Sequence, residues 1–413
     1  MKAGLQALTR SRRWMAAGLL FSVFGGLVGE GVIPGAVAVG ALAVAWIPIF
    51  TTVETLEDLF SVAAARVIER YDAGRVLIFA ELFVGAGAVG ALVAIWAGAP
   101  QFPVFVCFAL ITSIVPLIID IAEEIYAGEV AKQDRDSALK FNIAIYTVIG
   151  LVGTLLARPL GAALVSVGVP IVLILTVASS ILALLCRLYS IRSFSSIAGT
   201  TSLKGDLELE DDERGRKVPW QAAISTRTPG GPLISMLSGA AGAMLSTYAA
   251  IWLVKDLANE NVTLAIVFIC IGLGATLGPL GVRHAGKIGN ASSLRILFAL
   301  RLIATLGIGA VALLTDPGAW RLSAGTACLT ALAAGTAATA VVQATARQTE
   351  YRDEGLSQIV GWAHSAAALG ILIGVWVGLI LGVSEMPLIG SVVAAGLIAS
   401  SALLIQTPSS RED

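Results

Sequence analysis

Charged residues are scarce in this chain of 413 residues, at 13% of the sequence against about 25% in an ordinary soluble domain. There are two histidines, and the four cysteines (Cys107, Cys186, Cys270 and Cys328) stand singly inside apolar runs. This pattern lacks the spacings of a metal cluster or a disulfide framework. No phosphate-binding loop, zinc motif or nucleophile beside a positioned base occurs, so we predict no enzyme, no cofactor and no metal site.

Apolar and small residues are abundant instead. Hydrophobic residues make up 57% of the chain and its mean hydropathy is +0.87, which indicates that lipid is the solvent. The 44 glycines against 14 prolines agree, because small residues let helices approach closely within a membrane. The net charge of -1 argues against a nucleic-acid partner.

Twelve apolar runs are long enough, at about 20 residues each, to cross the hydrocarbon core of a bilayer. In the first half they cover residues 14–32, 36–64, 76–96, 102–126, 141–166 and 170–189. In the second half they cover residues 232–257, 262–282, 294–315, 320–346, 358–383 and 386–405. We therefore predict an all-α membrane protein with twelve transmembrane helices.

The runs divide evenly about a polar segment with an acidic stretch. This predicts an N-terminal six-helix bundle (1–190), a cytoplasmic linker (191–231) and a C-terminal six-helix bundle (232–413). We interpret the acidic stretch as solvated and flexible, with docking of a partner as the alternative.

The basic residues of the short loops predict the orientation, because Lys and Arg are retained on the cytoplasmic side. With both termini inside, the outer loops hold only Lys255 and Arg321. We predict a multi-pass protein of a bacterial inner membrane with both termini cytoplasmic.

The loop after the second run, residues 65–77, carries a specific motif. It contains an acid-Arg pair, Glu69 and Arg70, followed by Gly74 and the basic Arg75 at the start of the next run. This pattern resembles the loop between helices two and three of the major facilitator superfamily, with Ala65 in place of the leading Gly. A weaker copy without the acid, residues 281–287, follows the eighth run.

The fifth run adds a second likeness. Its Gly150, Gly153, Pro159 and Gly161 are similar to a Gly-rich, Pro-containing motif of the superfamily's antiporters, with Arg158 where Gly is more usual. The resemblance implies two pseudo-symmetric six-helix bundles and a substrate site between them near mid-membrane. It also favours export in exchange for protons.

Ionisable side chains within the runs each need a partner or a function, because they are costly in lipid. Glu30 and Arg158 lie at similar depths, counted at about 1.5 Å per residue, so we expect an ion pair between the first and fifth helices. The alternative is that Glu30 reaches water at the outer face. Glu81 and Arg301 belong to helices that are peripheral in the superfamily, and for both we expect snorkelling or a local pair.

Acids gather at one end of the second and fourth runs. Glu54, Glu57 and Asp58, and likewise Asp120, Glu123 and Glu124, are spaced to share one helix face. They form either a structural network with nearby arginines or a proton-coupling site, for which the deepest acids, Glu54 and Asp120, are the leading candidates. His364 lies at a similar depth in the eleventh run, either in contact with these acids at a gate or as a neutral, hydrogen-bonded histidine.

Polar and amphipathic groups of the remaining central runs are the candidates for a substrate surface. They are Asn142, Tyr146, Thr247, Tyr248, Gln343 and Trp362. Their mixture is compatible with a bulky, partly apolar solute and lacks a sugar-like polar cluster.

These observations predict a secondary active transporter, specifically a proton-coupled exporter of a small organic molecule such as a drug, metabolite or siderophore. The expected partners are the solute, protons and the lipid bilayer, and we expect a monomer. An uptake symporter, a facilitator and a non-transporting membrane scaffold or receptor are the alternatives.

Overall fold

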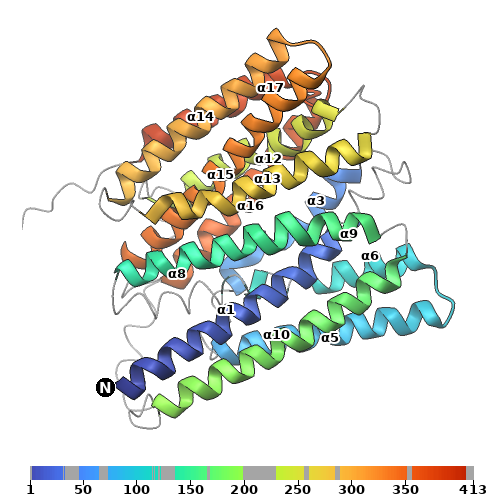
Figure 1. Cartoon of the computed structure of the whole chain (residues 1–413), viewed down its shortest axis with the longest axis vertical. Helices are drawn as coiled ribbons and strands as arrows, with labels where there is room; N and C mark the ends of the chain where they lie inside the picture. The colour runs from blue at the N-terminus through green and yellow to red at the C-terminus, as the bar shows by residue number, and fades with distance from the viewer. Residues whose placement is uncertain are drawn as a thin grey trace, which may run out of the picture.

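A computed structural model of the chain describes residues 2–30, 32, 46–64, 73–113, 115, 117–119, 121, 135–164, 168–198, 229–254, 260–283, 289–350 and 356–405. These residues form helices joined by turns, and no strand occurs among them (Figure 1). Within them, 8 helices are long and apolar enough to cross a membrane. The predicted all-α membrane class is confirmed, whereas the exact number of crossings stays a prediction.

The elements follow the predicted runs closely, and every predicted run overlaps at least one of them. The first half contains α1 (Lys2–Glu30), α3 (Trp46–Leu56), the 3-10 turn η1 (Glu57–Phe60), α5 (Ala73–Trp96), α6 (Gln101–Thr112), α8 (Arg135–Val148), the π-helical segment η2 (Ile149–Ala157), α9 (Arg158–Leu164) and α10 (Val169–Ala198). The second half contains α12 (Pro232–Val254), α13 (Glu260–Gly281), α14 (Asn290–Leu314), α15 (Ala319–Glu350), α16 (Leu356–Ile380) and α17 (Pro387–Leu404).

Helix is the form that this composition favours, since lipid offers no water to pair with backbone groups and a helix pairs them internally. α5 shows the pattern, with Arg75 and Glu81 as its only charges in 24 residues. Glycine ends several helices: Gly98 and Gly168, in the turns after α5 and before α10, have φ of 95° and 129°, which side chains disfavour.

The helices pack into two groups that occupy separate regions of Figure 1. In the N-terminal group, α10 packs against α1 and α5, and α5 contacts α6. In the C-terminal group, α12 packs against α16 and α17, and α15 packs against α13 and α14. The predicted boundaries at 190 and 231 stay a prediction, because residues 199–228 lie outside the described part of the chain.

Two helix pairs connect the groups. α3 and η1 pack against α16, and α8 and η2 pack against α13, with α8 also touching α15. We call these contacts the α3–α16 seam and the α8–α13 seam. Each one joins a helix from the first half of the chain to a helix from the second, so a movement between the groups must change both seams.

The helix that runs from α8 into α9 contains a wider, π-helical stretch. Pro159 follows it closely, and a proline lacks the N–H and crowds the carbonyl four residues before it. Gly150 and Gly153 within the stretch are weak helix formers as well. The glycine and proline positions that resemble the antiporter motif therefore coincide with a local departure from α-helix, a feature that is frequent at functional sites.

Candidate functional site

The α3–α16 seam brings the acidic η1 turn against α16. His364 of α16 lies within electrostatic reach of the Asp58 carboxylate. The neighbouring Ser365 hydroxyl lies 3.1 Å from the backbone oxygen of Asp58 and 3.0 Å from that of Leu59, and it donates to them. This arrangement places a carboxylate and an imidazole on opposite sides of the seam, so each can respond to the charge of the other.

Other polar contacts involve the same two segments, α3 and η1. The Ser113 hydroxyl donates to Oε1 of Glu57, while Glu57 Oε2 is buried without a hydrogen-bond partner among the described residues. Further along the seam, the Trp376 indole N–H donates to the Thr52 hydroxyl over 2.9 Å. The second predicted helix thus presents a polar face to α16.

Glycine sets the closeness of approach at both seams. A Cβ on Gly361 would lie 2.9 Å from Val62 Cα and 3.0 Å from the Ser61 carbonyl oxygen. A Cβ on Gly150 would lie 2.8 Å from the Ala275 carbonyl oxygen. Backbone therefore meets backbone at each seam, with no room for a side chain.

Asn142 links α8 to α15 in a buried network of amide and hydroxyl groups. Its side-chain nitrogen donates to the Thr345 hydroxyl over 2.9 Å and to Gln348 Oε1 over 2.8 Å. All three side chains are buried, so the network is shielded from water. Because buried polar groups are costly when unpaired, these bonds favour the arrangement in which α8 and α15 touch.

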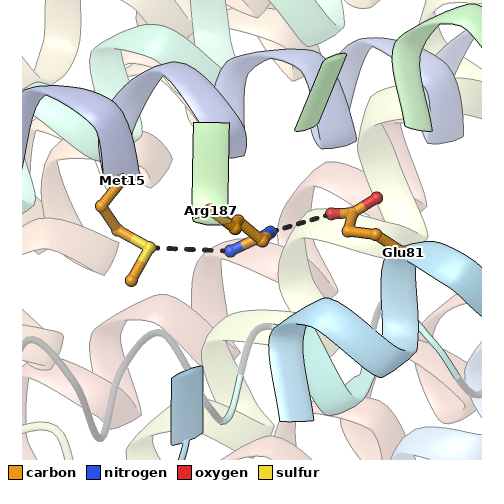
Figure 2. A network of polar contacts seen from close by, with 3 residues as sticks. All are labelled: Met15, Glu81 and Arg187. Atoms are coloured by element: carbon orange, nitrogen blue, oxygen red, sulfur yellow. Dashed lines mark hydrogen bonds and ion pairs between the residues drawn. The ribbon is translucent and has the colours of Figure 1, made fainter. Parts of the chain in front are cut away.

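A buried ion pair lies inside the N-terminal group (Figure 2). One nitrogen of the Arg187 guanidinium on α10 lies 3.0 Å from Glu81 Oε1 on α5, and a second donates to the Met15 sulfur of α1 over 3.7 Å. The Ser22 hydroxyl of α1 also hydrogen-bonds to Glu81. With exposures of 0% for Arg187 and 2% for Glu81, both charges are removed from solvent. The local pair expected for Glu81 is confirmed.

Arg301 has a different environment in the C-terminal group. Its side chain is fully buried, so the snorkelling expected for it is wrong. The guanidinium donates to the Ser238 hydroxyl over 2.6 Å and to the Ser238 backbone oxygen over 3.3 Å, and it lies 5.4 Å from the Phe298 ring centroid. Among the described residues no carboxylate pairs with it.

Several predicted site residues fall outside what the structure describes. These are the positions of Glu69, Arg70, Asp120 and Glu124 and the side chains of Glu30, Glu54 and Arg158. Gly74 and the exposed Arg75 begin α5, as the loop motif implies. α1 does pack against α9, as a pair between Glu30 and Arg158 requires, but the pair itself stays a prediction.

The predicted substrate-surface residues lie on four helices, α8, α12, α15 and α16. Asn142 is engaged in the network with α15, and the fully buried Tyr248 donates its hydroxyl to the Val375 backbone oxygen over 2.8 Å. Gln343 is buried with its side-chain nitrogen unpaired among the described residues. The other three, Tyr146, Thr247 and Trp362, are partly buried. A shared substrate surface stays a prediction.

Sequence reasoning missed Arg187 and Gly361. Arg187 stands near the end of a predicted run, where a basic residue is expected to reach water, so its position gave no signal of burial. The similar depth of Glu81, three predicted runs earlier in the chain, was the available clue. Gly361 is one of 44 glycines, and only the packing of α16 distinguishes it.

Comparison with solved structures identifies the fold. The chain is similar to a bacterial homologue of the iron transporter ferroportin in its outward-facing state, with a TM-score of 0.67, 14% identity, and coverage of 96% of this chain and 98% of that one. A second structure of the bacterial homologue, soaked with iron, gives a TM-score of 0.67 at 12% identity, with 95% and 98% coverage.

The human organic anion transporter MFSD10 (TETRAN) is similar as well, with a TM-score of 0.69, 16% identity, and coverage of 97% of this chain and 99% of that one. No protein-family profile and no curated protein sequence matches the chain. The chain therefore shares the fold of these transporters over nearly its whole length, in agreement with the fold that the loop motif implies.

Proposed function

We propose that the chain is a secondary active transporter of the major facilitator type, a proton-coupled exporter that moves a small organic molecule by alternating access. The fold supplies two helix groups, and the two seams between them supply surfaces that can open and close. The carrying observation is the packing of the acidic η1 turn against α16, where Ser365, the neighbour of His364, donates to the Asp58 backbone oxygen over 3.1 Å.

The chemistry of Asp58 and His364 suits proton coupling. A carboxylate facing an imidazolium attracts it and holds the seam closed, and protonation of Asp58 removes that attraction. His is the side chain whose charge changes most readily near neutral pH. In this mechanism a proton delivered to the pair weakens the seam, and its release to the other side restores it. Glu54 and Asp120 remain additional coupling candidates from the sequence.

The direction of transport and the cargo are inferred from the fifth run and from the structural neighbours. The glycines at 150 and 153 and the π-helical stretch around them resemble the antiporter motif, which favours export. An organic anion is the cargo named for one structural neighbour, and iron is named for the protein whose homologue is the other. An uptake symporter or facilitator is the alternative within transport, and a scaffold or receptor is the alternative outside it.

The test begins with a thermal-shift screen of the purified chain, in which Fe²⁺ is included beside small organic compounds. Stabilising compounds are then offered to inverted vesicles with an acidic interior, which only a proton-coupled exporter loads. Accumulation that collapses when the gradient is dissipated supports the proposal. Loading that ignores the gradient points to a facilitator, and no uptake of any stabilising compound points to a non-transporting protein.

Variants of the pair test the coupling. Asp58→Asn and His364→Gln are expected to abolish gradient-driven loading and to flatten the dependence of the transport rate on pH. Asp316→Asn, in an exposed loop, removes the same charge elsewhere and should leave both unchanged. A wild-type pH profile in both pair variants would show that protons are coupled at another place.

A further inference from the structure

Arg301 carries more hydrogen-bond donors than the described residues of the protein satisfy. A guanidinium has five N–H donors and keeps its positive charge in proteins. Here two contacts to Ser238 are its hydrogen bonds among the described residues, and its Nε–H, buried, has none. The side chain is fully removed from solvent. A buried arginine with this pattern lacks the partner that its charge requires.

The surrounding helices cannot supply that partner. α12, α14, α16 and α17 contain no Asp or Glu, and the acids of α13 and α15, Glu260 and Glu350, are terminal residues of those helices. Gly335, which touches the Arg301 chain, lies 15 positions before Glu350, or about 22 Å along the helix. Arg187, by contrast, has a carboxylate partner, since one of its guanidinium nitrogens lies 3.0 Å from Glu81 Oε1.

The fold nevertheless brings this guanidinium inward. A Cβ on Gly335 would lie 2.6 Å from Arg301 Cγ, so the missing side chain on α15 is what lets the arginine pass. It reaches Ser238 of α12, which is partly exposed. Ser235, one turn earlier on the same face of α12, has a buried hydroxyl without a partner among the described residues. One cation and two hydroxyls are thus gathered at a place where, among the described residues, no carboxylate pairs with the cation.

We propose that Arg301, together with Ser238 and Ser235, binds the anionic group of the transported molecule, which makes the cargo an organic anion bearing a carboxylate, sulfonate or phosphate. The planar guanidinium suits such groups because it can donate two parallel hydrogen bonds to two oxygens. The partial exposure of Ser238 marks the side from which the anion enters. This inference rests on the proposed transport function and specifies its substrate class. A phospholipid headgroup offers the same phosphate chemistry, so the test separates it from a free solute.

Thermal unfolding of the purified full chain in an uncharged detergent provides the first arm. Sodium benzoate and inorganic phosphate are titrated against sodium chloride at matched ionic strength, and phosphatidylglycerol is added to separate micelles. We expect a saturable rise in Tm of about 2 °C or more with a soluble anion. A rise with phosphatidylglycerol alone would overturn the solute assignment, and no rise with any anion would overturn the proposal.

Arg301→Met decides whether the shift comes from this site. It should abolish the anion-dependent shift and, because it removes an unpaired buried charge, raise the Tm of the anion-free protein. Arg295→Met, at an exposed arginine on the same helix, should retain the shift. Arg301→Lys keeps the charge without the planar fork and should weaken the apparent affinity about tenfold or more, which keeps the test valid if the methionine variant does not fold. An unchanged shift in the Arg301 variants overturns the proposal.

Transport separates this inference from the function on which it depends. Proteoliposomes are loaded with benzoate or with uncharged benzamide, and counterflow is compared between wild type and Arg301→Met. Loss of benzoate counterflow in the variant supports the inference. If wild type and variant both move benzamide and neither moves benzoate, the anion-binding inference is overturned, whereas the proposed transport function is retained. An Arg301-dependent Tm shift without movement of any solute retains the anion site and refutes the transport function.

Discussion

Replacement of Arg187 by methionine tests whether the buried pair in the N-terminal group is a structural element. The substitution leaves the Glu81 carboxylate at 2% exposure with the Ser22 hydroxyl as its remaining described partner. Breaking a buried pair by removal of one partner costs about 3–5 kcal/mol. For a unit of about 190 residues, the length predicted for the N-terminal bundle, this loss of stability corresponds to a fall in Tm of about 6–20 °C.

The double variant Glu81→Leu/Arg187→Met supplies the control. When both charges are replaced by apolar groups, nothing unpaired remains, and stability is expected to return close to that of wild type or above it. Thermal unfolding monitored by tryptophan fluorescence measures all four proteins of the cycle. Single variants within about 1 kcal/mol of wild type, or a double variant as unstable as the sum of the singles, would show that Glu81 and Arg187 do not stabilise each other.

Two further substitutions address the contacts between the groups. Gly361→Ala places a Cβ against the backbone of the facing helix, so we expect a loss of about 1–3 kcal/mol of stability and slower transport. Gly396→Ala, at an open exposed site, should be neutral or slightly stabilising. Equal changes in Tm for the two variants would contradict the close packing at Gly361. Asn142→Ala removes both hydrogen bonds from α8 to α15 and leaves Thr345 and Gln348 buried without them. We therefore expect a loss of about 1–3 kcal/mol of stability and faster hydrogen exchange at the start of α8. Unchanged exchange there would show that the network does not hold these helices together.

Hydropathy and a short loop motif were sufficient to predict the fold. Runs of about 20 apolar residues specify helices because lipid leaves the backbone no other partner, and Gly74 and Arg75 at the start of α5 fit the motif's place in the superfamily. The identity of Glu81's partner was not predictable in the same way. Counting residues along a run gives depth in the membrane, but the direction in which a side chain points depends on how neighbouring helices are rotated.

For the candidate site too, the sequence predicted the depth of residues in the membrane but not the direction of their side chains. Depth placed His364 near the acids of the second run, and the structure brings it within reach of Asp58. Sequence alone could not separate Asp58 from Glu57, because the spacing places both on the helix face that they share with Glu54, at nearly the same depth. Arg301 was noticed as a lone charge, but its burial follows from Gly335 on another helix, and no local pattern reports a contact between residues so far apart in the chain.

The π-helical stretch between α8 and α9 has a consequence for helical phase. Such a segment is equivalent to an α-helix with an inserted residue, so deletion of one residue within 149–157 would allow an uninterrupted α-helix. The wider turns advance by a smaller angle per residue than the roughly 100° of an α-helix, so the stretch absorbs much of the rotation that an extra residue would otherwise add. An extra residue can therefore be carried in the middle of this helix without a full rotation of α9 against α8.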